Sequence, residues 1–251
     1  MPVTILYSDA AIIAVNKPPG MPVHEAPGPR RSLLRELREQ AGLVAVAPAH
    51  RIDMDASGVL ILARTREAAS ELQRHWPEAE KTYTALCEGL PANEQGAIDA
   101  PILEHQTAKP ERMANAVKYY EAGHPGETLP PLPPAKSSAV HPAGRAAQTD
   151  YHVLEKFGRW SLLEVRPHQG RMHQIRVHLA HAGLPLAVDP LYGKRAELRE
   201  KDLREGGGER VLLTRLSLHA AKLTFLFAGK KTTVEAPLAD DVAAVLFYLR
   251  G

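Results

Sequence analysis

Short strand-like segments dominate this sequence, and helical segments fall among them without a regular strand–helix–strand alternation. A doubly wound parallel sheet requires that alternation, because each parallel connection crosses over through a helix. The sequence therefore predicts an α+β fold with a mixed, largely antiparallel sheet. Strands are expected over residues 3–6, 12–16, 59–63, 81–88, 149–154, 160–165, 212–220, 223–227 and 232–235.

Four helices are expected from capping residues and apolar spacing. Ser32 and Thr65 are typical N-cap residues, since a hydroxyl oxygen can accept a hydrogen bond from an N–H of the first turn. The helices that they begin are expected to end near Gly42 and His75. The other two helices are expected over residues 172–181 and 239–249.

A chain of 251 residues with 44% hydrophobic residues can bury a sizeable core, and we expect a single domain over residues 1–251. Residues 105–147 differ from the rest, because they are rich in proline and show little periodicity. We interpret this segment as a surface insertion within the domain, partly in extended conformation.

Charge and cysteine content narrow the class of protein only slightly. The net charge of +2 permits a nucleic-acid partner without requiring one, since binding depends on how charges are grouped. The single cysteine, Cys87, excludes an intrachain disulfide and suits a reducing compartment. The first residues lack a signal-peptide pattern, and no apolar stretch is long enough to cross a bilayer. We therefore expect a cytoplasmic protein without a membrane segment.

Residues 50–58 are a candidate active-site loop. They place two carboxylates, an arginine, a histidine and a serine directly before the apolar segment 59–63. A rigid strand behind a polar loop commonly presents catalytic side chains. The alternative is a solvated turn with an Asx or serine cap.

Residues 168–178 form a second concentration of polar side chains. Gly170 permits a tight turn, after which Arg171 and His173 are expected in the first turn of a helix, where anions are favoured. Arg176 follows on a half-apolar face, so a paired anion is expected for it. The alternative is a helix whose arginines and histidines simply point to water.

Metal and nucleotide sites are not expected. Among the histidines of this region, only His178 and His181 have a suitable spacing for a metal, and no cysteine or acidic ligand joins them. Cys87 lies in an apolar strand and is interpreted as a structural thiol. The sequence has no phosphate-binding glycine loop and no dinucleotide fingerprint.

Several motifs resemble, in order, those of the RluA-type pseudouridine synthases. The longest are His50-Arg51-Ile52-Asp53-x-x-x-Ser57-Gly58 and Gly170-Arg171-x-His173-Gln174-Ile175-Arg176-x-His178. The shorter ones are Val15-Asn16-Lys17-Pro18-x-Gly20, Lys81-x-Tyr83-x-Ala85, Gly183-x-Pro185, Asp189-x-x-Tyr192-Gly193 and Leu218-His219-Ala220-x-x-Leu223. Ala56, Met172 and Val188 depart from the residues usual in that family, and none of the three is expected to do chemistry.

The resemblance implies an RNA-modifying isomerase. It implies a pseudouridine synthase fold, with a bent sheet, helices on its outside and a central RNA-binding cleft. It assigns the catalytic roles to Asp53, Tyr83 and Arg176. Asp53 would attack the sugar carbon or take part in proton chemistry there, Arg176 would pair with it, and Tyr83 would stack on the uracil. If Asp53 and Arg176 lay on opposite faces of the molecule, this mechanism would be wrong.

The resemblance also suggests residues that bind the substrate. Arg51 would fill the space that the extruded base vacates, since a stacked base cannot reach a buried pocket. Leu223 would line the apolar side of the pocket. Lys17, Arg171 and His173 are candidates for contacts to the RNA backbone or for support of the site.

The expected partner is structured RNA, with ribosomal RNA of the large subunit and transfer RNA both open. No cofactor, metal or nucleotide is expected, and the protein is expected to act as a monomer. The resemblance covers nearly the whole chain except the proline-rich segment, and a separate N-terminal RNA-binding domain is not expected. Two alternatives remain open: a hydrolase that uses Asp53 and Asp55 as a carboxylate pair, and a module that binds RNA without catalysis.

Overall fold

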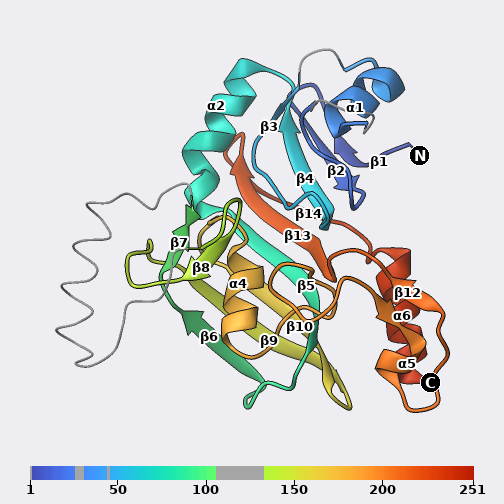
Figure 1. Cartoon of the computed structure of the whole chain (residues 1–251). Coiled ribbons are helices and arrows are strands. Elements are labelled where there is room, and N and C mark those ends of the chain that lie inside the picture. The colour runs from blue at the N-terminus through green and yellow to red at the C-terminus, as the bar shows by residue number, and fades with distance from the viewer. Residues whose placement is uncertain (1, 26–30, 44–45, 106–132) are drawn as a thin grey trace.

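A mixed ten-stranded sheet forms the centre of the molecule (Figure 1). The computed structural model describes residues 2–25, 31–43, 46–105 and 133–251. The main order of the strands is β1-β2-β4-β13-β5-β10-β9-β6, with β3 added on β4 and β14 on β13. Their bounds are β1 Thr4–Ser8, β2 Ile12–Lys17, β3 Ala47–Pro48, β4 Ser57–Ala63, β5 Glu80–Glu88, β6 Gln95–Asp99, β9 Gln148–Phe157, β10 Trp160–Pro167, β13 Leu218–Phe227 and β14 Lys230–Glu235.

Two small sheets and several helices surround the central sheet. The small sheets pair β7 (Ile102–Glu104) with β8 (Ser138–Val140), and β11 (Leu198–Arg199) with β12 (Val211–Leu213). The helices are α1 (Leu33–Ala41), α2 (Arg66–His75) with a following 3-10 turn (Trp76–Glu78), α4 (Gln174–His181), α5 (Glu200–Leu203) and α6 (Asp240–Arg250). The α+β prediction is therefore confirmed.

The pairing between β13 and β4 is the one parallel contact in the central sheet among the described residues. His219 pairs with Ser57 and Ala220 with Gly58, whereas the other strand pairs are antiparallel. This short parallel contact joins an early strand to a late one, directly behind the loop that carries Asp53.

The core lies on both faces of β4, which explains why its sequence is continuously apolar rather than alternating. Val59 and Ile61 pack in the cluster that contains Leu72 of α2. Leu60 and Leu62 pack in the cluster that contains Leu33 and Leu37 of α1. Helix α4 covers another part of the sheet, where its apolar side chains pack with those of β5 and β10 (Figure 1).

The predicted starts of two helices are confirmed. The Ser32 hydroxyl accepts a hydrogen bond from the Arg35 N–H at 3.2 Å, and the Thr65 hydroxyl accepts one from the Ala68 N–H at 3.1 Å. Gly42 ends α1 in the left-handed conformation, with φ of 62°. Short polar side chains at these positions satisfy N–H groups that have no partner inside the helix.

Several boundaries differ from the prediction. Helix α4 begins at Gln174 and not at Met172, because His173 has φ of 58° and stands outside the helix. The predicted segments 212–220 and 223–227 are divided differently: β12 ends at Leu213, and β13 continues through an irregularity between Ala220 and Lys222. Strand β6 was not predicted, because only one of its five residues is buried.

The prediction of a surface insertion over residues 105–147 is wrong for its second part. Residues 106–132 lie outside the described residues. Within 133–147, β8 pairs with β7, and Ser138, His141 and Ala147 are buried. This part packs beside α4, because apolar side chains such as Ile102 and Val177 close a small core around Ala147.

Candidate active site

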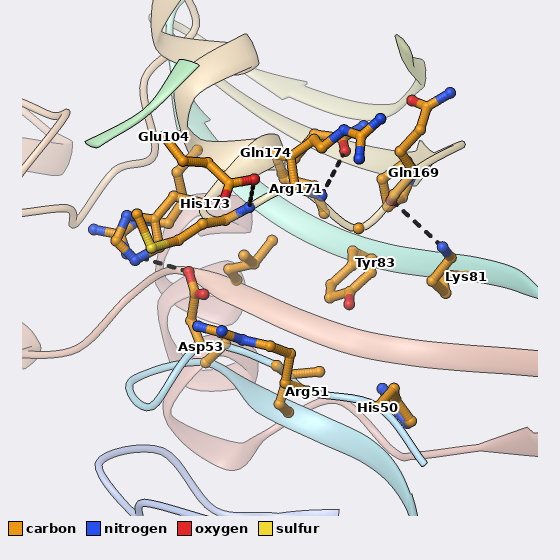
Figure 2. A pocket seen from close by; sticks show the side chains of 18 of the residues that line it. His50, Arg51, Asp53, Lys81, Tyr83, Glu104, Gln169, Arg171, His173 and Gln174 are labelled. Atoms are coloured by element: carbon orange, nitrogen blue, oxygen red, sulfur yellow. Dashed lines mark hydrogen bonds and ion pairs between the residues drawn. The ribbon is translucent and has the colours of Figure 1, made fainter. Parts of the chain in front are cut away.

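The two polar segments singled out in the sequence meet at one pocket with a cavity volume of about 280 Å³ (Figure 2). The loop before β4 forms one wall, and the turn before α4 together with the start of α4 forms the opposite wall. Strand β5 lies between them. The lining residues that matter for the argument are Arg51, Asp53, Tyr83, His173, Arg176 and Leu218.

The loop that carries Asp53 is held from behind by Lys17. The Lys17 ammonium is fully buried and donates hydrogen bonds to the carbonyl oxygens of Met54, Pro18 and Met21 at 2.7, 2.8 and 3.1 Å. Burial lowers the pKa of Lys17 to about 8, against the opposing charges of Asp55 and Asp53. Lys17 was expected either to contact the RNA backbone or to support the site. Its ammonium faces the loop backbone and it does not line the pocket, so it supports the site.

Arg176 joins two carboxylates. Its Nη1 donates to Asp53 Oδ2 at 3.1 Å, and its Nε and Nη2 donate to the two oxygens of Asp189 at 2.7 and 2.8 Å. The guanidinium is buried, with 8% of the side chain exposed, so this bidentate geometry leaves it little freedom. The expected contact between Asp53 and Arg176 is thus present, and it fixes the direction of the Asp53 carboxylate.

Asp189 is a site residue that the sequence did not assign, although the motif Asp189-x-x-Tyr192-Gly193 was noticed. Its carboxylate is fully buried and also accepts hydrogen bonds from the N–H groups of Leu191 and Tyr192. Burial disfavours its ionised form, but the hydrogen bonds and charge of Arg176 outweigh burial and hold the pKa of Asp189 below its usual value. Burial lowers the pKa of Arg176, but the hydrogen bonds and charges of Asp189 and Asp53 outweigh burial and raise this pKa above its usual value.

Tyr83 reaches the pocket from β5. It pairs with Val165 of β10 and with Ala220 of β13, so its backbone is held between two neighbouring strands. Burial, together with the charge of Asp53, raises the pKa of the Tyr83 hydroxyl well above its usual value. The hydroxyl is therefore a proton or hydrogen-bond donor at neutral pH, and not a base.

His173 is fixed at the turn before α4 by Tyr192. The Tyr192 oxygen accepts a hydrogen bond from the Ser138 N–H at 2.7 Å and lies 2.9 Å from His173 Nδ1. Because the first contact uses the oxygen as an acceptor, its proton is available for His173. Burial lowers the pKa of His173, which favours the neutral ring that this contact requires.

Arg51 and Arg171 both line the pocket near its mouth. The Arg51 side chain is exposed. The Arg171 guanidinium donates to the Ala146 carbonyl oxygen at 3.1 and 3.3 Å and so ties the turn before α4 to the segment before β9.

Leu223 does not line the pocket. Its side chain is buried in the apolar cluster of α2 and β4, where α2 and the following turn cover that part of β13. Leu218, at the start of the same strand, forms the apolar floor. The residue type was predicted, but its position in the strand was wrong.

The described residues contain neither a cluster of metal-binding side chains nor a membrane-spanning helix. Among the described residues, no group of three or more His, Cys, Asp or Glu side chains is arranged to hold a metal ion. In the same part of the chain, no helix is both long and apolar enough to span a membrane.

Known proteins resemble this chain along most of its length. A model of the RNA pseudouridylate synthase family matches residues 11–181. An uncharacterised RNA pseudouridine synthase of Chloroflexus aurantiacus is 37% identical, over 94% of this chain and 66% of that protein. The ribosomal large subunit pseudouridine synthase D of Nitrosomonas europaea is 34% identical, over 100% of this chain and 66% of that protein.

The chain thus spans about two thirds of the length of these two relatives. The solved structure of human RNA pseudouridylate synthase domain containing 1 matches with a TM-score of 0.69 at 22% identity, covering 99% of this chain and 95% of that one. At that identity the likeness shows the fold alone.

Proposed function

The chain belongs to the RNA pseudouridylate synthase family, and on that premise we propose that it isomerises selected uridines in RNA to pseudouridine with Asp53 as the essential carboxylate. The observation that carries this proposal is the Asp53 carboxylate, which lines the pocket while Arg176 fixes it from one side. Tyr83 lines the same pocket, so a uracil could lie against an aromatic ring there.

The reaction breaks the bond between ribose C1′ and uracil N1 and forms a bond between C1′ and uracil C5. The uracil turns over between these steps, C5 loses its proton, and N1 gains one. Asp53 would act at the sugar, either as a nucleophile on C1′ or as a base, and both roles need an ionised carboxylate held at a fixed angle. Because the raised pKa keeps the Tyr83 hydroxyl protonated, Tyr83 would donate a hydrogen bond or proton to the uracil.

The pocket requires the target nucleotide to leave its stack. A cavity of about 280 Å³ accommodates a nucleotide but not a helix, so the base must flip out, which typically costs a few kcal/mol. Arg51 is exposed at the mouth of the pocket and could take the place of the extruded base. Arg171 and His173 would support the RNA from the opposite wall.

Large-subunit ribosomal RNA is the substrate that we propose to test first. The relative from Nitrosomonas europaea is named for that substrate and matches the whole of this chain. Transfer RNA is the alternative. Since a single chain brings Asp53, Tyr83 and Arg176 together, we propose that the protein acts as a monomer, without a nucleotide cofactor, in the cytoplasm where ribosomal RNA is found.

Release of tritium from RNA labelled at C5 of uracil tests the proposal, because C5 loses its hydrogen when it bonds to C1′. Wild type, Asp53→Ala and Asp55→Asn should be compared on unmodified large-subunit ribosomal RNA and on transfer RNA. We expect release by wild type and by Asp55→Asn, and none by Asp53→Ala.

The control variant separates the alternatives. A hydrolase that uses Asp53 and Asp55 as a pair would free uracil from the RNA without releasing tritium, and would lose that activity in both variants. Binding of RNA by wild type with neither tritium nor uracil released would leave only a binding module, and tritium release by Asp53→Ala would remove Asp53 from the mechanism.

A further inference from the structure

One guanidinium below the pocket connects three separate parts of the fold. Arg215 Nη1 donates to the Ser57 hydroxyl at 3.2 Å and to the carbonyl oxygens of Leu216 and Leu218 at 2.9 and 3.4 Å. On its other side the guanidinium binds both carboxylate oxygens of Asp241, with Nε at 2.8 Å from Oδ2. Only 9% of the Arg215 side chain is exposed, and it does not line the pocket.

The hydrogen bonds around Ser57 form a chain in which Arg215 donates to Ser57 and Ser57 donates to His219. His219 Nε2 lies 3.4 Å from the Ala236 carbonyl oxygen, which can only accept, so we assign the ring proton to Nε2. His219 Nδ1 is then free to accept from the Ser57 hydroxyl at 2.9 Å, and the Ser57 oxygen accepts from Arg215. Burial lowers the pKa of His219 and supports this neutral ring.

These contacts lie directly behind the reacting groups. Ser57 is the first residue of β4 and follows the turn in which the Ala56 N–H donates to the Asp53 carbonyl oxygen at 3.1 Å. Leu218 is the first residue of β13 and forms the pocket floor. Arg215 therefore holds the end of the Asp53 loop and the floor beneath it at a fixed separation.

The C-terminal helix anchors this arrangement. Asp241 belongs to the first turn of α6, where a carboxylate is also favoured by the helix N-terminus. Burial disfavours its ionised form, but the hydrogen bond and charge of Arg215 outweigh burial and lower the pKa of Asp241. A guanidinium can bind a carboxylate with two nitrogens and still direct Nη1 at other acceptors, which a lysine ammonium cannot do from a single nitrogen.

We infer that Arg215 is a positioning residue for the reaction, which sets the Asp53 carboxylate against the pocket floor without touching the substrate. This inference rests on the proposed function. Misplacement of a reacting group by about 1 Å can cost about 100-fold in rate. Loss of Arg215 should therefore lower kcat while leaving the RNA-binding surface, and hence KM, nearly unchanged.

The test compares Arg215→Gln with Arg199→Gln in the full-length protein. Arg199 also joins several groups, Glu197 and Glu209 among them, but it lies away from the pocket. Tritium release from large-subunit ribosomal RNA should be measured at a temperature well below the melting midpoint of each variant. We expect kcat to fall about 10- to 100-fold in Arg215→Gln, with KM within about 3-fold of wild type. Arg199→Gln should keep both constants, and Arg215→Lys should not restore kcat.

A crystal structure of Arg215→Gln gives a readout that does not depend on turnover. We expect the Asp53 Oδ2 to Arg176 Nη1 distance, 3.1 Å here, to lengthen or the loop to shift relative to Leu218. An unchanged pocket in that structure, or a kcat equal to that of Arg199→Gln, would overturn the inference. Absence of turnover in wild type would instead contradict the proposed function, and the structure would still decide the role of Arg215.

Discussion

At the scale of single residues, the pocket depends on a group of three charges, of which the reaction itself needs only two. Arg176 carries one positive charge between the two carboxylates of Asp53 and Asp189. Asp189 is fully buried and bidentate, whereas the Asp53 side chain keeps 18% of its surface exposed toward the pocket. Asp189 therefore fixes the guanidinium, and Asp53 is left accessible for chemistry.

Removal of the Asp189 charge should cost stability as well as activity. In Asp189→Asn, Arg176 would remain buried with a single carboxylate partner, and breaking a buried pair typically costs about 3–5 kcal/mol. We expect a loss of that order in urea unfolding and a large fall in turnover. Glu94→Gln, at an exposed ion pair with Lys156, is the matched control and should change stability by less than about 1 kcal/mol. Equal stability of the two variants would show that Asp189 does not hold the guanidinium.

The Tyr83 hydroxyl can be tested apart from its ring. Tyr83→Phe keeps the surface on which a uracil would lie and removes the donor. Since a positioned acid or base typically contributes about 100-fold or more, we expect a fall of that size in kcat with little change in RNA affinity. Tyr151→Phe, which packs against the same apolar cluster but does not line the pocket, should keep full turnover. Full activity of Tyr83→Phe would restrict Tyr83 to stacking.

Site residues could be predicted from the sequence where they belong to recognisable motifs. The prediction failed where the burial of a side chain determines whether it reaches the pocket. The resemblance to the RluA-type motifs assigned roles to Asp53, Tyr83 and Arg176, and the structure brings all three to one pocket. Sequence left two roles open for Lys17, RNA contact and site support, because a lysine is normally exposed, whereas three carbonyl oxygens bind this one below the loop. Leu223 was misjudged because sequence does not reveal that α2 covers its part of β13.

At the scale of elements, the parallel pairing of β4 and β13 decides where the Asp53 loop ends. Gly58 has φ of 115°, and a Cβ atom there would lie 2.2 Å from the Ala220 carbonyl oxygen. Only a residue without a side chain permits this approach of two backbones. The close parallel contact of the two strands thus depends on one glycine that the sequence motif includes.

Gly58→Ala should separate the two strands. The substitution adds backbone strain of about 1–3 kcal/mol and a clash with backbone atoms that cannot move independently. We expect a loss of more than about 3 kcal/mol in the free energy of unfolding. Gly229→Ala is the control, because φ there is 71° but no atom lies within 4 Å of the added Cβ. Similar losses in both variants would show that backbone conformation alone accounts for the effect.

Element boundaries were predictable where a local signal sets them. The caps at Ser32 and Thr65 act within a single turn, and both helices begin where expected. Helix α4 was harder to delimit, because six of its eight residues are buried and no amphipathic pattern marks it. Its start depends on the contact of His173 with Tyr192, which lies 19 residues further along the chain.

At the scale of the whole molecule, several buried or half-buried histidines link stability to pH. Burial lowers the pKa of His50 to about 3, and it also lowers the pKa values of His173, His178 and His219. The folded state therefore binds fewer protons than the unfolded state below the ordinary histidine pKa of about 6.5. Their contribution to stability is fully present above that pH and is lost as the pH falls.

We expect the free energy of unfolding to decrease between about pH 6.5 and pH 4, by up to about 1.4 kcal/mol per pH unit for each histidine that stays neutral. Urea unfolding at a series of pH values measures this slope. His50→Gln should reduce the slope by the contribution of one site. A profile that is flat down to pH 4 would contradict the assignment of neutral buried rings.

The parallel contact of β4 with β13 also has a consequence for biosynthesis. Ser57 and its partner His219 are 162 residues apart in the chain. Ribosomes add about 5–20 residues per second, so the Asp53 loop emerges roughly 8–30 s before the strand that forms its floor. Throughout that interval the nascent chain carries the complete Asp53 motif without a pocket. Such a protein becomes competent only after β13 has been translated, and fragments that stop before β13 should be inert however much of the motif they retain.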